Sequence, residues 1–191
     1  SGINVLKGAK YCRASAADFN IVSNERLMKS NYPERIVCLT EETTETLYLL
    51  GEEDRIIGIS GFTVRPPRAR KEKPKVSAFT SAKIDRIISL EPDLVLGFSD
   101  LQADIAAELI RRGITVVVFN HRSVREILSM IRTLGAMVGA GQRADELVGE
   151  YETKIDRSLA RATDLARRPK VYFEEWDDPQ ISGISWVSQL I

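Results

Sequence analysis

Histidine and cysteine, on which most zinc and redox sites depend, are nearly absent from this sequence. Its 191 residues include one histidine, His121, and two cysteines, Cys12 and Cys38. Two cysteines at this spacing form neither a disulfide framework nor a metal-ligand motif, and one histidine argues against zinc hydrolysis and against a metal carrier built on imidazoles. Cys38 lies within an apolar run, where a buried free thiol is expected. We therefore predict no metal site, no resident cofactor and no catalytic site.

Excess charge of either sign is also lacking. Lysine and arginine total 27, and aspartate and glutamate total 27, which gives a net charge of zero and no whole-protein reason to bind nucleic acid or an acidic membrane. The basic loop at residues 65–75 has no interleaved aromatic residues and is interpreted as a solvated connection. No apolar stretch approaches the roughly 20 residues of a membrane span. Because 43% of the residues are hydrophobic and only 12 are glycine, a globular fold follows.

Short apolar runs rich in isoleucine and valine begin after Tyr32 and alternate with helical stretches. The runs are continuously apolar rather than alternating, which is typical of parallel strands covered on both faces. This alternation predicts an open α/β lobe with a parallel sheet and right-handed crossovers. The predicted strands are residues 35–39, 55–59, 94–98, 115–119 and 170–173, with a further short strand near Val76.

Capping signals place the helices between these strands. Thr40 precedes a predicted helix over residues 41–50, whose acidic first turn suits the positive end of the helix dipole, and Gly51 ends it. Ser123 and Glu126 have the spacing of a capping box before a second apolar periodic stretch. Both signals support the strand–helix alternation.

One predicted helix is longer than a crossover between neighbouring strands requires. Residues 142 to about 167 contain no helix-breaking residue pattern, and at 1.5 Å per residue this helix would be about 40 Å long. The apolar positions fall on one stripe, interpreted as a packed core face, and the charged positions on a solvated face. We therefore predict four regions. They are an N-terminal extension of unknown role (1–31), an N-terminal α/β lobe (32–138), a long inter-lobe helix (139–169) and the beginning of a second α/β lobe (170–191).

Three phenylalanines follow the predicted strands, at positions where polar loop residues would be ordinary. Open α/β sheets bind ligands beyond the carboxyl ends of their strands, and Phe62, Phe79 and Phe98 lie at or just past such ends. They suggest a wall for a large, flat, partly apolar ligand, although each could instead anchor its loop on the core. The acidic run 174–178 lacks the spacing of a calcium loop and is interpreted as a strand-end loop that faces the same crevice. No dinucleotide fingerprint, phosphate loop or nucleophile elbow follows any strand.

Four phrases of the sequence carry a resemblance to a known family. They are RIVCLT at residues 35–40, IGIS at 57–60, IDRIISLEPDLV at 84–95 and VYFEEWDDP at 171–179. With them, the stretch from Tyr32 to Ile191 resembles the first part of a substrate-binding protein of bacterial ABC importers, of the class whose two lobes are joined by one long rigid helix. Within that class it is most similar to the cobalamin-binding members, with siderophore and haem carriers as close relatives.

The resemblance implies a ligand held between two lobes. The aromatic clamp positions of the first lobe correspond to Phe62, Phe79 and Phe98, where the family often has tyrosine or tryptophan. Further ligand contacts are implied at Thr40, Glu41, Glu175 and Trp176. The carboxylate that docks on arginines of the membrane permease corresponds to Asp85, where glutamate is more usual and where an acid at a helix N-terminus is an alternative explanation. The resemblance also implies most of a second lobe after Ile191.

These implications define the expected function. We expect the substrate-binding component of an ABC importer, which binds a corrinoid (cobalamin-like) ligand without chemical turnover and delivers it to a permease. The expected location is periplasmic, or extracellular and membrane-associated. The alternatives are a siderophore or haem carrier of the same class, or an intracellular α/β sensor or interaction module. An uncovered sheet edge and an uncovered stripe on the long helix would favour a dimer through the incomplete lobe.

Overall fold

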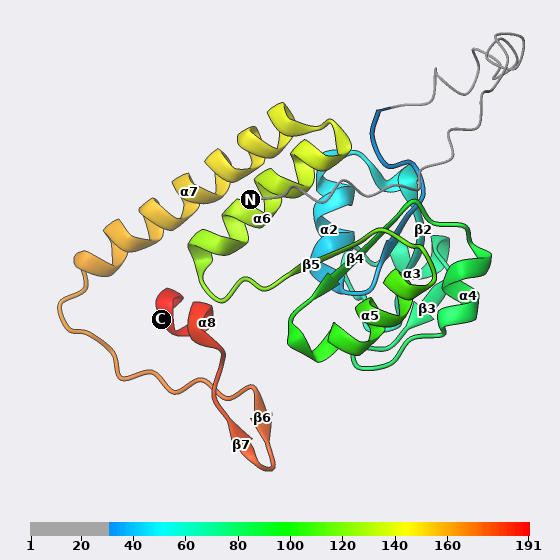
Figure 1. Ribbon diagram of the computed structural model, residues 1–191. Coiled ribbons are helices and arrows are strands. Elements are labelled where there is room, and N and C mark those ends of the chain that lie inside the picture. The colour runs from blue at the N-terminus through cyan, green and yellow to red at the C-terminus, as the bar shows by residue number, and fades with distance from the viewer. Residues whose placement is uncertain (1–30) are drawn as a thin grey trace, which may run out of the picture. The chain divides into compact units, whose positions relative to one another are not determined.

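The computed structural model describes residues 31–191, of which Tyr32–Ile191 form one unit. The predicted N-terminal extension, with Cys12, lies outside the described residues apart from its last position. Five parallel strands form one sheet in the order β3-β2-β1-β4-β5 (Figure 1). Their bounds are β1 Ile36–Cys38, β2 Ile56–Ser60, β3 Lys75–Ser77, β4 Leu94–Phe98 and β5 Val116–Phe119. The prediction of an open parallel α/β lobe is confirmed.

Helices begin where the capping signals place them, although the side chain of Thr40 makes no capping hydrogen bond to the helix that follows it. Ser123 accepts a hydrogen bond from the Glu126 amide at 3.2 Å, and the Glu126 carboxylate accepts one from the Ser123 amide at 3.0 Å, so the capping box is formed. None of the helices in the described part of the chain is long and apolar enough to cross a membrane. The helical elements are α2 Glu41–Leu50, η2 Glu53–Arg55, α3 Ala69–Glu72, α4 Ile84–Ser89, η3 Asp100–Gln102, α5 Ala103–Arg111, α6 Val124–Val138, α7 Gly141–Thr163 and α8 Ser185–Leu190.

The sheet separates two hydrophobic layers, and strand β1 faces both of them. Ile36 and Cys38 pack with residues of α2, α6 and α7, whereas Val37 and Leu39 pack with residues of α4 and α5. This three-layer arrangement explains why the strand sequences are continuously apolar. Cys38 is a fully buried free thiol, as predicted, and burial raises its pKa to about 12 despite hydrogen bonds from nearby threonines. It is therefore an unreactive core residue at neutral pH.

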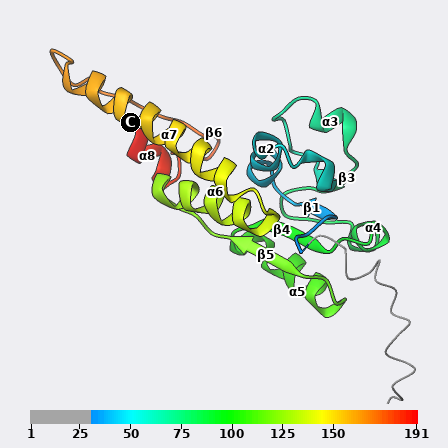
Figure 2. The ribbon, with the colours of Figure 1, turned by 90° about the horizontal axis from the view of Figure 1, so that it is seen from above.

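Helices α6 and α7 lie side by side in both ribbon views (Figures 1 and 2). A Cβ atom at Gly135 would lie 2.3 Å from the Cβ of Ala144, so only glycine allows this close approach. Gly139, with φ of 80°, ends α6 in the left-handed conformation that favours glycine. Helix α7 has 23 residues, and from Glu152 to its end every residue except Ile155 is exposed. The apolar stripe thus packs in the core only along the first half of the helix, and the exposed Leu159 agrees with the expectation of an uncovered stripe on its second half.

The segment that follows α7 departs from the sequence prediction. Residues 170–173 were predicted to form a strand, but they have no regular secondary structure, and Tyr172 is 72% exposed. Pairing begins only at the hairpin of β6 Trp176–Asp177 and β7 Gln180–Ile181. The prediction is wrong because an apolar run makes a buried strand only beside another strand, and no strand of the described residues lies next to it.

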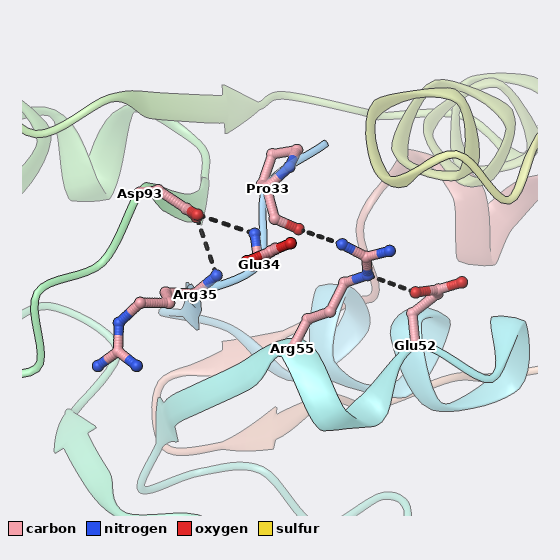
Figure 3. Close-up of polar contacts among 6 residues, drawn as sticks. All are labelled: Pro33, Glu34, Arg35, Glu52, Arg55 and Asp93. Carbon is pink, nitrogen blue, oxygen red and sulfur yellow. Dashed lines mark hydrogen bonds and ion pairs between the residues drawn. The ribbon is translucent and has the colours of Figure 1, made fainter. Parts of the chain in front are cut away.

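Polar contacts fasten the start of the lobe to the amino-terminal edge of the sheet (Figure 3). Asp93, just before β4, accepts hydrogen bonds from the backbone amides of Glu34 at 2.8 Å and Arg35 at 3.0 Å. Arg55 donates to the carbonyl of Pro33 at 2.7 Å. Asp93 therefore holds the chain ahead of β1, at the edge of the sheet opposite to the carboxyl ends of the strands.

Candidate ligand-binding site

The loops that follow all five parallel strands meet at one edge of the sheet. The chain runs outward from β1 to β2 and β3 on one side, and β4 and β5 lie on the other side of β1. The topological switch point, where ligands of open α/β sheets bind, is therefore between β1 and β4. A cavity of about 560 Å³ opens there. Its lining comes from the strand-end loops (Arg65, Phe79, Phe98, Ser99, Leu101, His121, Arg122), from α2 (Glu42, Glu45, Thr46, Leu49), from α6 and α7 (Ile127, Met130, Ile131, Tyr151) and from the C-terminal segment (Glu175, Ile184, Trp186).

The cavity brings together three of the residues expected from the sequence. Phe79 and Phe98 line it after β3 and β4, and Glu175 lines it from the segment before β6. Phe62 lies after β2 at the same edge, but it is 64% exposed and does not line the cavity. Trp176 is 60% exposed on the hairpin, and Trp186 of α8 lines the cavity in its place.

The expected contacts after β1 lie beside the cavity rather than in it. Thr40 is buried; its hydroxyl donates to Glu42 at 2.7 Å, and its carbonyl accepts from the Thr44 hydroxyl at 3.1 Å. Thr40 thus holds the loop and the first turn of α2 together. Glu41 does not line the cavity, and its carboxylate lies 3.4 Å from the guanidinium of Arg65. The next residue, Glu42, faces the cavity instead.

An aromatic and cationic cluster forms one wall. The ring centroids of Phe98 and His121 are 4.6 Å apart, and the two ring planes are inclined by 39°. The guanidinium carbon of Arg122 lies 5.5 Å from the Phe98 centroid. Burial lowers the pKa of His121, with Arg122 lowering it further and Glu126 opposing the shift. The imidazole is therefore mainly neutral at pH 7. Its Nδ1 is buried and has no hydrogen-bond partner among the described residues.

Acidic groups from helix α2 form another part of the lining. Burial raises the pKa of the Glu42 carboxyl, although the hydrogen bond from Thr40 opposes the shift. Glu45 lies 3.4 Å from the exposed guanidinium of Arg65. Within residues 31–191, no group of three or more histidine, cysteine, aspartate or glutamate side chains is placed to hold a metal ion. The arrangement suits a ligand that is flat and mostly apolar, with a few polar groups at its edge.

The lining residues that the sequence reasoning missed include His121, Arg122, Glu42 and Trp186. His121 follows the predicted strand 115–119, so the strand-end rule that selected the phenylalanines applies to it as well. Asp85, the proposed docking residue, lies away from the cavity in the first turn of α4. It is 93% exposed, with Oδ1 at 3.8 Å from Arg112 of α5.

Comparison with known proteins places the chain in a family. Residues 36–191 match the model of the family described as "Periplasmic binding protein". An uncharacterised ABC transporter substrate-binding lipoprotein of Bacillus subtilis, YvrC, is 30% identical over 83% of this chain and 52% of its own length. A cobalamin-binding protein of Halobacterium salinarum is 28% identical over 81% of this chain and 43% of its own length.

Solved structures share the fold. The periplasmic vitamin B12 binding protein BtuF of Vibrio cholerae superposes with a TM-score of 0.68 at 19% identity, over 78% of this chain and 58% of that one. Structures of proteins that bind haem or siderophores share the fold as well. The chain spans about half the length of the curated relatives it matches. Because the family match extends over most of the sequence, the chain belongs to the periplasmic binding protein family.

Proposed function

We propose that this chain is the ligand-capturing part of an ABC importer's substrate-binding protein and that it binds a corrinoid such as cobalamin without chemical change. The observation that carries the proposal is the cavity at the switch point of the sheet, walled by Phe79, Phe98 and His121. Relatives described as cobalamin-binding support the choice of ligand.

The chemistry of the cavity suits a corrinoid. The faces of Phe79 and Phe98 offer apolar stacking surface to a flat macrocycle. Arg122 lines the cavity and can donate to carbonyl groups, which matches the amide side chains at the edge of a corrin ring. A corrinoid is larger than this cavity, so the ligand would extend over the strand-end loops toward exposed Phe62.

Transport also requires a contact with the permease, and we assign this contact to Asp85. Asp85 is an exposed carboxylate outside the cavity, with only a long ion pair to Arg112, so it is available to arginines of a membrane partner. The location outside the cytoplasmic membrane follows from the same role. In this proposal residues 32–138 form the first lobe, residues 139–169 lead away from it, and residues 170–191 begin a second lobe.

Tryptophan fluorescence tests the proposal because only one described tryptophan lines the cavity. The chain is titrated with cyanocobalamin, haemin and a ferric siderophore, with N-acetyltryptophanamide as the control for light absorption by the ligand. Quenching by cyanocobalamin should saturate in Trp176→Phe, which keeps Trp186, and should be much smaller in Trp186→Phe.

Each result decides between the candidates. Saturation with haemin or the siderophore alone would move the function to the haem or siderophore carriers of the class. No saturable response to any of the three ligands would contradict the proposed function.

A further inference from the structure

Gln102 is the last residue of η3, just before α5, and its buried amide joins three of the strand-end loops. The side chain is fully buried and does not line the cavity. Its Oε1 accepts from the backbone amide of Phe98 at 3.0 Å. Its Nε2 donates to the carbonyl of Phe79 at 2.9 Å and to the carbonyl of Leu39 at 3.4 Å. The ends of β1, β3 and β4 are thereby connected through a single side chain.

Three of the four hydrogen bonds that a glutamine amide can make are formed with these partners. A glutamine side chain has two N–H donors, and both are used on carbonyls, while its oxygen accepts from an amide. A carboxylate in this place would have no donor, and an apolar side chain would leave all three backbone groups unpaired in the interior, which is costly. No other common side chain of this length offers the same donors and acceptor.

The backbone around Gln102 is shaped to admit it. A Cβ atom at Gly97 would lie 2.9 Å from the Gln102 Oε1, so the glycine in β4 leaves room for the amide. Ser99, between Phe98 and Gln102, has a positive φ of 63°, an unfavourable conformation for a residue with a side chain. Its amide donates to the Phe119 carbonyl at 2.7 Å, which ties this turn to the end of β5 as well. A strained turn of this kind persists only where its surroundings fix it.

We propose that Gln102 is a positioning residue for the ligand site: its amide holds the backbones of Phe79 and Phe98 at the spacing that a flat ligand needs. This inference rests on the proposed function, because it assigns a role within the same site. The side chain touches no ligand, and it acts by fixing the two loops that carry the phenylalanines before the ligand arrives.

Two variants separate positioning from simple filling of space. Gln102→Met keeps the length and removes the hydrogen bonds, and it should weaken cyanocobalamin binding about tenfold or more at every pH. Gln102→Glu should weaken binding similarly near pH 7.5. The affinity of this variant should recover to within about threefold of wild type near pH 5, because a protonated carboxyl donates to the carbonyl of Phe79 and accepts from the amide of Phe98. Each value is taken relative to wild type at the same pH. Gln142→Glu, an exposed change of equal charge, is the control and should bind as wild type does.

Hydrogen exchange measured without ligand keeps this inference distinguishable from the proposed function. The Phe98 amide should lose protection in Gln102→Met and regain it near pH 5 in Gln102→Glu, whether or not any corrinoid binds. In wild type, the side-chain amide protons of Gln102 should exchange more than about a hundredfold more slowly than those of Gln142. That comparison needs no variant and remains decisive if a variant does not fold.

Three results would overturn the inference. They are wild-type affinity in Gln102→Met, no recovery at low pH in Gln102→Glu, and equal exchange of the two glutamine side chains in wild type. If wild type binds none of the ligands, the proposed function fails, and the exchange of the Phe98 amide alone then supports or overturns the role of Gln102.

Discussion

The side chain of Phe98 provides the sharpest test of the cavity as the ligand site. It is half-buried, lines the cavity and lies 4.6 Å from the ring of His121. Full burial of a phenylalanine contributes about 1.5–3 kcal/mol, so covering its remaining exposed part with ligand is worth about 1 kcal/mol. Stacking against a flat ring adds about 0.5–1.5 kcal/mol. Phe98→Ala should therefore lose about 2 kcal/mol of binding free energy, which is about a 30-fold rise in Kd.

The assay is isothermal titration calorimetry with cyanocobalamin, together with a thermal melt of each variant. The melt should show a loss of stability below about 1 kcal/mol, because the ring lies at the edge of the core rather than within it. Phe173→Ala is the matched control: Phe173 is also partly exposed, but it lies outside the cavity and should change Kd by less than about twofold. Wild-type affinity in a normally folded Phe98→Ala variant would refute the assignment of the cavity.

Four further predictions follow from the same structure. Phe62→Ala should raise Kd only about threefold, because Phe62 is exposed outside the cavity; a loss larger than that of Phe98→Ala, measured by the same calorimetry, would place the ligand elsewhere. Burial raises the pKa of Glu42 in the folded state. Its carboxyl therefore contributes stability below a pH of about 4.3, the pKa in the unfolded chain, and this stability is lost as the pH rises through the folded-state pKa. Glu42→Gln should therefore raise the midpoint of urea unfolding at neutral pH and have the wild-type midpoint at about pH 4. An unchanged midpoint at neutral pH would contradict this. Asp85→Ala should leave cyanocobalamin affinity unchanged and reduce transport when the variant is placed in a complete transport system; unchanged transport would remove the docking role. Because Leu159 is exposed on the second half of α7, light scattering should show a mass that rises with concentration and falls in Leu159→Ser, whereas a monomer at all concentrations would exclude this association.

The lobe was predictable because burial of a strand on both faces appears directly in the sequence as an apolar run. A parallel strand covered by helices on both faces must be apolar at consecutive positions, as at Ile36 to Leu39, where alternate residues belong to opposite layers. The predicted bounds of these strands differ from the observed ones by at most one residue at either end. At residues 170–173 the same apolar signal was present without a neighbouring strand, and no strand formed.

The site was only partly predictable, because its lining depends on packing between distant segments. The rule that ligands lie at strand ends selected Phe79 and Phe98. The resemblance implied a contact at Glu41, but neither it nor the strand-end rule resolves which residue of an adjoining helix turns inward, and Glu42 lines the cavity instead. Trp186 and the residues of α6 and α7 reach the cavity only through tertiary packing. The role of Gln102 depends on carbonyls far away in the chain, and no local sequence pattern predicts it.

A crystal structure of this chain saturated with cyanocobalamin tests the central claim most directly. The corrin ring is expected at the carboxyl edge of the sheet, stacked on Phe79 and Phe98 with a polar edge group near Arg122. A corrin ring bound at the opposite edge of the sheet, or along the exposed half of α7, would contradict it.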